Sequence, residues 1–169
     1  MNIFMTSGTY DFLKRIKDKH PKETILLLQN NEGALLVHET ANKTVFSVPR
    51  SYEVLKSEGI LENSGFLILH HIPVMDDDKP VFEFRFKSEK TSLNENPGFI
   101  ALRVLRPLKS NTYIIFTLWR SEKAYMGWET SPSYQSFFQG AKSSTAQPQI
   151  FMGASYISKF YIPTEEDRI

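Results

Sequence analysis

Hydrophobic and polar positions follow two spacings along the chain, one typical of strands and one typical of helices. Short runs of alternating or continuous apolar residues predict strands at residues 1–7, 24–29, 34–39, 65–74, 99–108, 112–119 and 155–162. Apolar spacing near 3.6 predicts helices at 10–20 and 121–129, and Ser121 is placed to cap the second of them. Pro132 interrupts that helical pattern, so we expect a new helical turn from Ser131.

Other segments carry weaker signals. Residues 44–48 predict a short strand, and Ser51 is placed to cap a helix that runs to Ser57. The three acidic residues at 76–78 before Pro80 are typical of a helix start, although residues 81–86 fit a helix or a strand. Residues 143–149 are polar and predict a surface loop.

The order of these elements predicts the fold class. Each half gives strand, helix, strand, strand, helix, and a final strand closes the second half. This is the ferredoxin-like order, so we expect an α+β protein with two ferredoxin-like modules in tandem, at residues 1–63 and 64–169. The alternative is one α+β domain built on a single wide sheet.

Composition narrows the function classes. The 169 residues carry a formal net charge of +1, which argues against nucleic acid as a partner, since such proteins carry a basic excess. The absence of cysteine excludes disulfides, thiolate metal sites and cysteine nucleophiles. No apolar run approaches the roughly 20 residues that span a membrane, and no signal peptide is recognised, so we expect a cytoplasmic protein.

Two adjacent histidines are the main candidates for chemistry. His70 and His71 lie on one predicted strand and therefore face opposite sides of the sheet. Either could act as a general base or a metal ligand, although a lone buried histidine more often satisfies hydrogen bonds. His38, beside Glu39 on another strand, is a weaker candidate. The basic residues between positions 87 and 109, Arg103 among them, are interpreted as ordinary surface.

Aromatic residues gather in the segment from Leu118 to Phe138. Trp119 closes a strand, Trp128 follows nine residues later, and Tyr134 and Phe138 come after the proline break. The simpler interpretation is that these residues only form a core, as an aromatic helix packed on a sheet. The alternative is a pocket for a flat apolar small molecule.

This segment resembles the antibiotic-biosynthesis-monooxygenase superfamily of dimeric α/β-barrel proteins. The shared pattern is Trp, Ser, Ala-aromatic, Trp, Ser, aromatic, which here falls on Trp119, Ser121, Ala124-Tyr125, Trp128, Ser131 and Tyr134. The chain is most similar to two groups with an extra N-terminal module, the heme-degrading monooxygenases of HmoB type and the TRAP-type signalling proteins. The resemblance implies that the two modules form a pseudo-dimeric α/β barrel within one chain, and hence a monomer.

The resemblance also implies a heme site. Heme-degrading members use an Asn that contacts the bound oxygen, a Trp that distorts the porphyrin, and a His that ligates iron. These positions correspond to His70, Trp128 and Phe138, so only the Trp is retained. His70 or Tyr134 would then supply the axial ligand, His70 being the preferred metal ligand.

Two functions follow as expectations from the resemblance. The first is a heme-binding or heme-degrading, monooxygenase-like protein, an oxygenase if active, with His70 and Trp128 as the catalytic residues. Because two of the three family positions differ, turnover is expected to be slow or absent. The alternative is a non-enzymatic, TRAP-like signalling or stress-response protein that keeps the scaffold without the chemistry.

Overall fold

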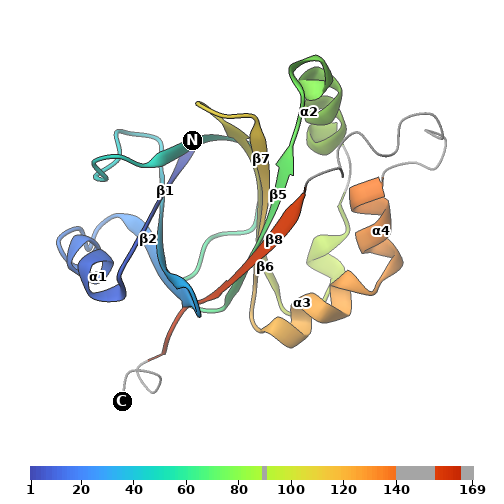
Figure 1. Cartoon of the computed structure of the whole chain (residues 1–169). Helices are drawn as coiled ribbons and strands as arrows, with labels where there is room; N and C mark the ends of the chain where they lie inside the picture. The colour runs from blue at the N-terminus through green and yellow to red at the C-terminus, as the bar shows by residue number, and fades with distance from the viewer. Residues whose placement is uncertain (89–90, 140–154, 165–169) are drawn as a thin grey trace.

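The computed structural model describes residues 1–88, 91–139 and 155–164. The expected loop at 143–149 and the last five residues of the chain lie outside these ranges. In the part of the chain that is described, eight strands close into one barrel and four helices pack outside it (Figure 1). The elements are β1 Asn2–Gly8, α1 Tyr10–Asp18, β2 Thr24–Asn30, β3 Gly33–Thr40, β4 Arg50–Glu58, β5 Phe66–Pro73, α2 Lys79–Ser88, β6 Phe99–Pro107, β7 Thr112–Trp119, α3 Glu122–Glu129, α4 Pro132–Gln139 and β8 Tyr156–Tyr161.

The barrel is made of two four-stranded sheets with the same internal order. The order around the barrel is β1-β3-β2-β8-β5-β7-β6-β4, and every pairing is antiparallel. In each half the first strand, β1 or β5, lies between the third and the fourth strand of that half. The sheets meet at β4–β6 and at β2–β8. The expected fold class, an α+β pseudo-dimeric barrel of tandem ferredoxin-like type, is confirmed.

Residues 41–58 correct two secondary-structure predictions. Residues 44–48 form no strand, and the helix expected after Ser51 is instead the strand β4. Tyr52 and Val54 alternate toward the barrel interior, where both pack into the apolar core. β4 pairs with β1 on one side and β6 on the other, so it closes the barrel at this seam. The first half therefore contains one helix, α1.

Apolar side chains form three clusters in layers. The first fills the barrel interior, with Met5, Leu69 and Phe116 among its members. The second lies on the outer face of the C-terminal sheet beneath α2, α3 and α4. The third lies beneath α1 on the outer face of the N-terminal sheet. Figure 1 shows α1 on one side of the barrel and the three other helices on the opposite side.

The residue just before β6 lies so close to α3 that it must be glycine. Gly98 has a φ of +83°, and a Cβ atom there would lie 2.5 Å from the Cβ of Ala124. Both the backbone conformation and the contact exclude larger residues. The turn before β6 thereby fixes the start of α3 against the sheet.

No helix among the described residues is both long enough and apolar enough to cross a bilayer.

We expect the protein to be a monomer in solution. The chain pairs both sheets within itself and leaves no open sheet edge in the described part, so no second copy is needed to cover one. Sedimentation equilibrium at micromolar concentration should give the mass of one chain, 19.5 kDa. A tight dimer would contradict this expectation.

Candidate functional site

Two short helices place the aromatic residues of the site. α3 begins at Ser121 as predicted, because the Ser121 hydroxyl accepts the Ala124 N–H at 3.1 Å. Ser131 then joins the two helices: its hydroxyl donates to the Trp128 carbonyl at 2.6 Å and accepts the Tyr134 N–H at 3.3 Å. This cap ends α3 and begins α4, which holds Trp128 and Tyr134 on the same side of the sheet.

The two adjacent histidines face opposite sides of β5, as the alternation predicts. His70 follows Ile68 on the face covered by the helices, whereas His71 follows Leu69 on the face toward the barrel interior. His70 is 5% exposed and lies beside a pocket. The strand thus directs His70, and not His71, toward α4.

The pocket beside His70 has a volume of about 260 Å³. Its walls include the rings of Tyr134 and Phe138 from α4, and Tyr156 and Ile157 from β8. The Phe138 ring centroid lies 4.4 Å from that of His70. The structure therefore brings together three of the residues selected from the sequence, His70, Tyr134 and Phe138, on one pocket.

Trp128, the fourth selected residue, lies behind the pocket wall rather than on it. Its side chain is 1% exposed and stacks on Trp119 with ring centroids 5.3 Å apart. The Tyr134 ring meets it edge-on at 4.9 Å, and the Phe138 ring lies 6.0 Å away. Trp128 therefore supports the two α4 residues that form the wall.

His70 is held in its neutral form. Burial, with a smaller contribution from repulsion by His71, lowers the pKa of His70 to about 3. Its Nε2 lies 3.3 Å from the Tyr134 hydroxyl, while its Nδ1 is buried without a hydrogen-bond partner among the described residues. A neutral imidazole with one uncommitted nitrogen can accept a hydrogen bond or coordinate a metal centre.

The lowered pKa of His70 predicts that acid destabilises the ligand-free protein. An unfolded histidine has a pKa near 6.5, so between about pH 6.5 and 3 the unfolded state binds the extra proton. As the pH is lowered through that window, the free energy of unfolding should therefore decrease, by up to about 1.4 kcal/mol per pH unit from this residue. Urea denaturation at pH 7, 6, 5 and 4 measures the slope.

His70→Gln is the comparison for this pH series. The free energy of unfolding of this variant should depend less steeply on pH than that of the wild type, because glutamine does not bind a proton. The carboxylates titrate in both proteins, so their contribution cancels in the difference. Equal slopes for the two proteins would contradict the burial of a neutral imidazole at position 70.

His71 lies in a different environment. Its Nε2 is 3.0 Å from the Ser158 hydroxyl, and its ring stacks on Tyr156 with centroids 4.3 Å apart. Burial, together with the charge of Arg50, lowers its pKa to about 4. His71 is thus engaged by residues of the barrel and does not line the pocket.

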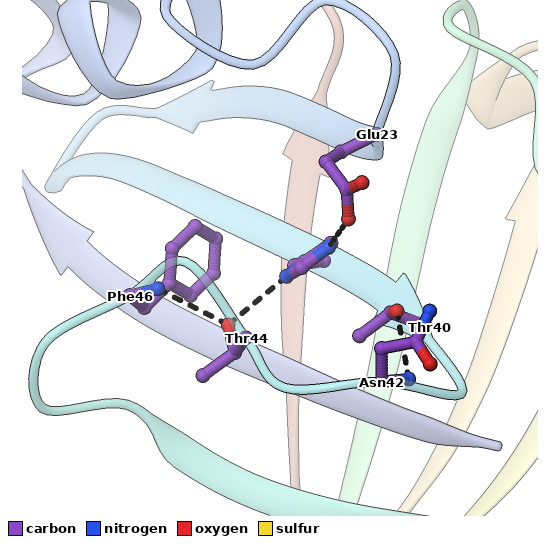
Figure 2. Close-up of polar contacts among 6 residues, drawn as sticks. Glu23, Thr40, Asn42, Thr44 and Phe46 are labelled. Carbon is purple, nitrogen blue, oxygen red and sulfur yellow. Dashed lines mark hydrogen bonds and ion pairs between the residues drawn. The ribbon is translucent and has the colours of Figure 1, made fainter.

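His38 has partners at both ring nitrogens. Its Nε2 lies 2.7 Å from a Glu23 carboxylate oxygen, and its Nδ1 lies 2.9 Å from the Thr44 hydroxyl. In Figure 2 the dashed lines that end at Glu23 and at the Thr44 hydroxyl mark these two contacts. The contacts hold the segment around Thr44 and Phe46 on the outer face of the N-terminal sheet, which makes His38 a structural residue.

The sequence interpretation missed two polar residues near the pocket. The Tyr125 hydroxyl donates to the Glu129 carboxylate at 2.8 Å. The spacing of four residues on a predicted helix was the available signal, since such positions share a face. No group of three or more acidic or histidine side chains in the described residues is placed to hold a metal ion.

Comparisons with known proteins support the resemblance seen in the sequence. Residues 66–140 match the family described as "Antibiotic biosynthesis monooxygenase". A heme-degrading monooxygenase of Listeria monocytogenes is 26% identical over 77% of this chain and 78% of its own length. The signal transduction protein TRAP of Staphylococcus epidermidis is 25% identical over 98% of this chain and 99% of its own.

Solved structures share the fold of this chain. The structure described as a major regulator of staphylococcal pathogenesis superposes with a TM-score of 0.86, at 26% identity over 97% of this chain and all of that chain. LmHde, a heme-degrading enzyme from Listeria monocytogenes, shares the fold with a TM-score of 0.73 at 22% identity, over 96% of this chain and all of that one. The predicted similarity to the superfamily, and to both groups within it, is confirmed.

Proposed function

We propose that this chain is a heme-binding protein related to the antibiotic-biosynthesis monooxygenases, with slow or no heme degradation. The observation that carries the proposal is His70, a neutral imidazole with an uncommitted Nδ1 beside an aromatic pocket. Similarity to the Listeria heme-degrading monooxygenase gives heme as the ligand to test.

The donor chemistry of the pocket fits heme. Histidine is a common axial ligand of heme iron, and the aromatic rings of Tyr134 and Phe138 suit a flat macrocycle. The pocket is small for heme, because small-molecule sites have volumes of roughly 300–1,000 Å³ and this pocket has a volume of about 260 Å³. Heme therefore enters only if the rings on α4 move outward from His70.

In the proposed site His70 would hold the iron, Tyr134 and Phe138 would contact the macrocycle, and Trp128 would support these two rings from behind. Bound heme would supply the oxygen chemistry of the family. At the position where the resemblance implies a histidine ligand, Phe138 has a hydrocarbon ring with no lone pair to offer iron. This is the reason to expect binding without efficient turnover.

The division of the chain into modules at residues 1–63 and 64–169 is part of the same proposal. The ligand pocket belongs to the second module, and the first completes the barrel behind it. Among the described residues α1 is the only helix on the outer face of the N-terminal sheet, and the segment around Phe46 also packs there, where His38 is already engaged by Glu23 and Thr44. One site per chain is therefore expected.

A hemin titration followed by absorbance tests the proposal. Wild-type protein should give a Soret band, and His70→Ala should weaken hemin binding by at least about tenfold, since loss of even an indirect metal contact costs that much. His71→Ala is the matched control because it removes the neighbouring imidazole from the opposite face. Addition of ascorbate to the complex should leave most of the Soret band in place.

The alternative function is a non-enzymatic, TRAP-like signalling or stress-response protein. Its support is the similarity to TRAP over nearly the whole chain and the small size of the pocket, in which Phe138 lies against His70. Absence of a Soret band from the wild-type protein would favour this function. A band that His71→Ala shifts and His70→Ala leaves unchanged would contradict the proposed ligand.

A further inference from the structure

The C-terminal end of α4 is held by a side chain from another helix. Arg85 lies on α2, and its Nη2 donates to the Phe137 carbonyl at 2.6 Å and reaches the Ser136 carbonyl at a longer 3.5 Å. The next residue, Phe138, places its ring 4.4 Å from that of His70. We propose that Arg85 is a positioning residue, which keeps α4 over the pocket and thereby limits the access of ligands to His70.

α4 depends on such a partner because it is short and does not neutralise its own C-terminus. The helix has eight residues, fewer than an isolated helix needs to be stable in water. The last four carbonyls of a helix have no partner within it, and the partial negative charge at that end favours a cation. α4 carries no basic residue in its last turn. Arg85 supplies the cation and the hydrogen-bond donor from α2.

Ring contacts join Arg85 to the pocket wall. The guanidinium carbon of Arg85 lies 4.7 Å from the ring centroid of Phe86. That ring meets Phe137 edge-on with centroids 5.3 Å apart, and Phe137 meets Phe138 at 5.0 Å. All three phenylalanines are buried. An outward movement of the end of α4 therefore breaks the hydrogen bonds of Arg85 and separates the α4 rings from Phe86.

The inference deepens the proposed function, on which it rests only for the identity of the ligand. In the open form, α4 has moved away from His70. A hydrogen bond from a charged donor is stronger than one between neutral groups, so its loss should raise the open fraction by about tenfold or more. A ligand that binds only the open form then gains affinity by the same factor.

Chemical modification of histidines in the hemin-free full chain tests the proposal. Diethyl pyrocarbonate acylates neutral imidazole, and tandem mass spectrometry resolves the rate at each histidine. His70 is neutral and 5% exposed, so its modification in the wild type should be slow and limited by opening of the pocket. Arg85→Met keeps an unbranched apolar side chain but removes the donors, and it should raise the rate at His70 by about tenfold or more.

Two controls separate opening of the pocket from a general loss of stability. His38 is fully buried on the opposite side of the barrel, with partners at both ring nitrogens, so its rate in Arg85→Met should stay close to that of the wild type. Lys87→Met removes a positive charge from an exposed position in the last turn of α2. It should leave the rate at His70 unchanged.

Hemin binding gives a second measurement, for which the charge alone predicts the opposite result. Hemin carries two propionates, so the loss of a cation would by itself weaken its binding. Arg85→Met should instead tighten hemin binding by about tenfold, because the open form is more populated. Arg85→Lys keeps the charge without the guanidinium fork and should give intermediate values in both measurements. It also serves if Arg85→Met fails to fold.

Three results of the modification experiment would overturn the inference. They are an unchanged rate at His70 in Arg85→Met, an equal rise at His38, and the same rise at His70 in Lys87→Met. If the wild type binds hemin, weaker binding by Arg85→Met would also overturn it. Exposure of His70 in Arg85→Met without hemin binding by any variant would support the inference and contradict the proposed function, so the two failures are distinguishable.

Discussion

Replacement of Trp128 by alanine is expected to lower the free energy of unfolding by about 3–5 kcal/mol. The indole is 1% exposed and lies at the centre of the aromatic cluster under α3 and α4. Its ring contacts Trp119, Tyr134 and Phe138, whose positions depend on it. Alanine leaves a cavity between two short helices and the sheet.

Chemical denaturation followed by circular dichroism measures this loss. Phe84→Ala is the matched control, since it also truncates a helical aromatic residue, but one that is 73% exposed on α2. The control should change the unfolding free energy by less than about 1 kcal/mol. If the two variants are equally stable, Trp128 does not support the aromatic cluster, and the positions of Tyr134 and Phe138 in the pocket wall do not depend on it.

The C-terminal half was the more predictable part of the molecule. Ser121 and Ser131 are caps with local partners, so the boundaries of α3 and α4 depend on neighbouring residues alone. The alternation along β5 depends only on strand geometry, and it separates His70 from His71. Features determined by contacts close in sequence are the ones that a single sequence reveals.

The strand β4 was mispredicted because its partners are distant in sequence. Ser51 followed by Leu55 fits a capped helix as well as it fits a strand. Pairing with both β1 and β6 decides between them, and β6 begins more than forty residues later. The signal within the segment was the alternation of Tyr52 and Val54, which is too short to outweigh the helical pattern.

The polar part of the site was also only partly predictable. His70 was selected for its strand position, but its neutral state depends on helices that fold over it. Of the two hydrogen bonds in this region, His70–Tyr134 and Tyr125–Glu129, only the second joins residues close enough in sequence to give a local signal. The protonation state and the hydrogen-bond partners of His70 therefore depend on burial and on long-range contacts, which the sequence alone does not reveal.

Arg103, interpreted from the sequence as a surface residue, lies inside the barrel and is 3% exposed. It follows Ala101 and precedes Leu105 on the inward face of β6, and this alternation was the signal that was overlooked. The guanidinium donates to both oxygens of Glu39 on β3, at 2.6 and 3.3 Å, and to the Glu58 carbonyl at 2.9 Å. A buried ion pair thus joins the two sheets across the interior.

Removal of one partner of this ion pair is expected to cost about 3–5 kcal/mol of unfolding free energy, because the other charge is left unpaired in a region of low polarity. Arg103→Met tests this loss, with Arg120→Met as the matched control. Arg120 lies 3.8 Å from Glu62 and its side chain is 65% exposed, so its replacement should cost less than about 1 kcal/mol.

The double variant Arg103→Met with Glu39→Leu separates charge burial from packing. If the loss in Arg103→Met comes from the stranded Glu39 carboxylate, apolar side chains at both positions should recover most of it, since neither then carries a charge into the interior. Urea denaturation of the two single variants and the double variant completes the cycle. A double variant as unstable as the sum of the single ones would show no coupling between the two side chains, and the loss in Arg103→Met would then come from its own packing and from its hydrogen bond to the Glu58 carbonyl.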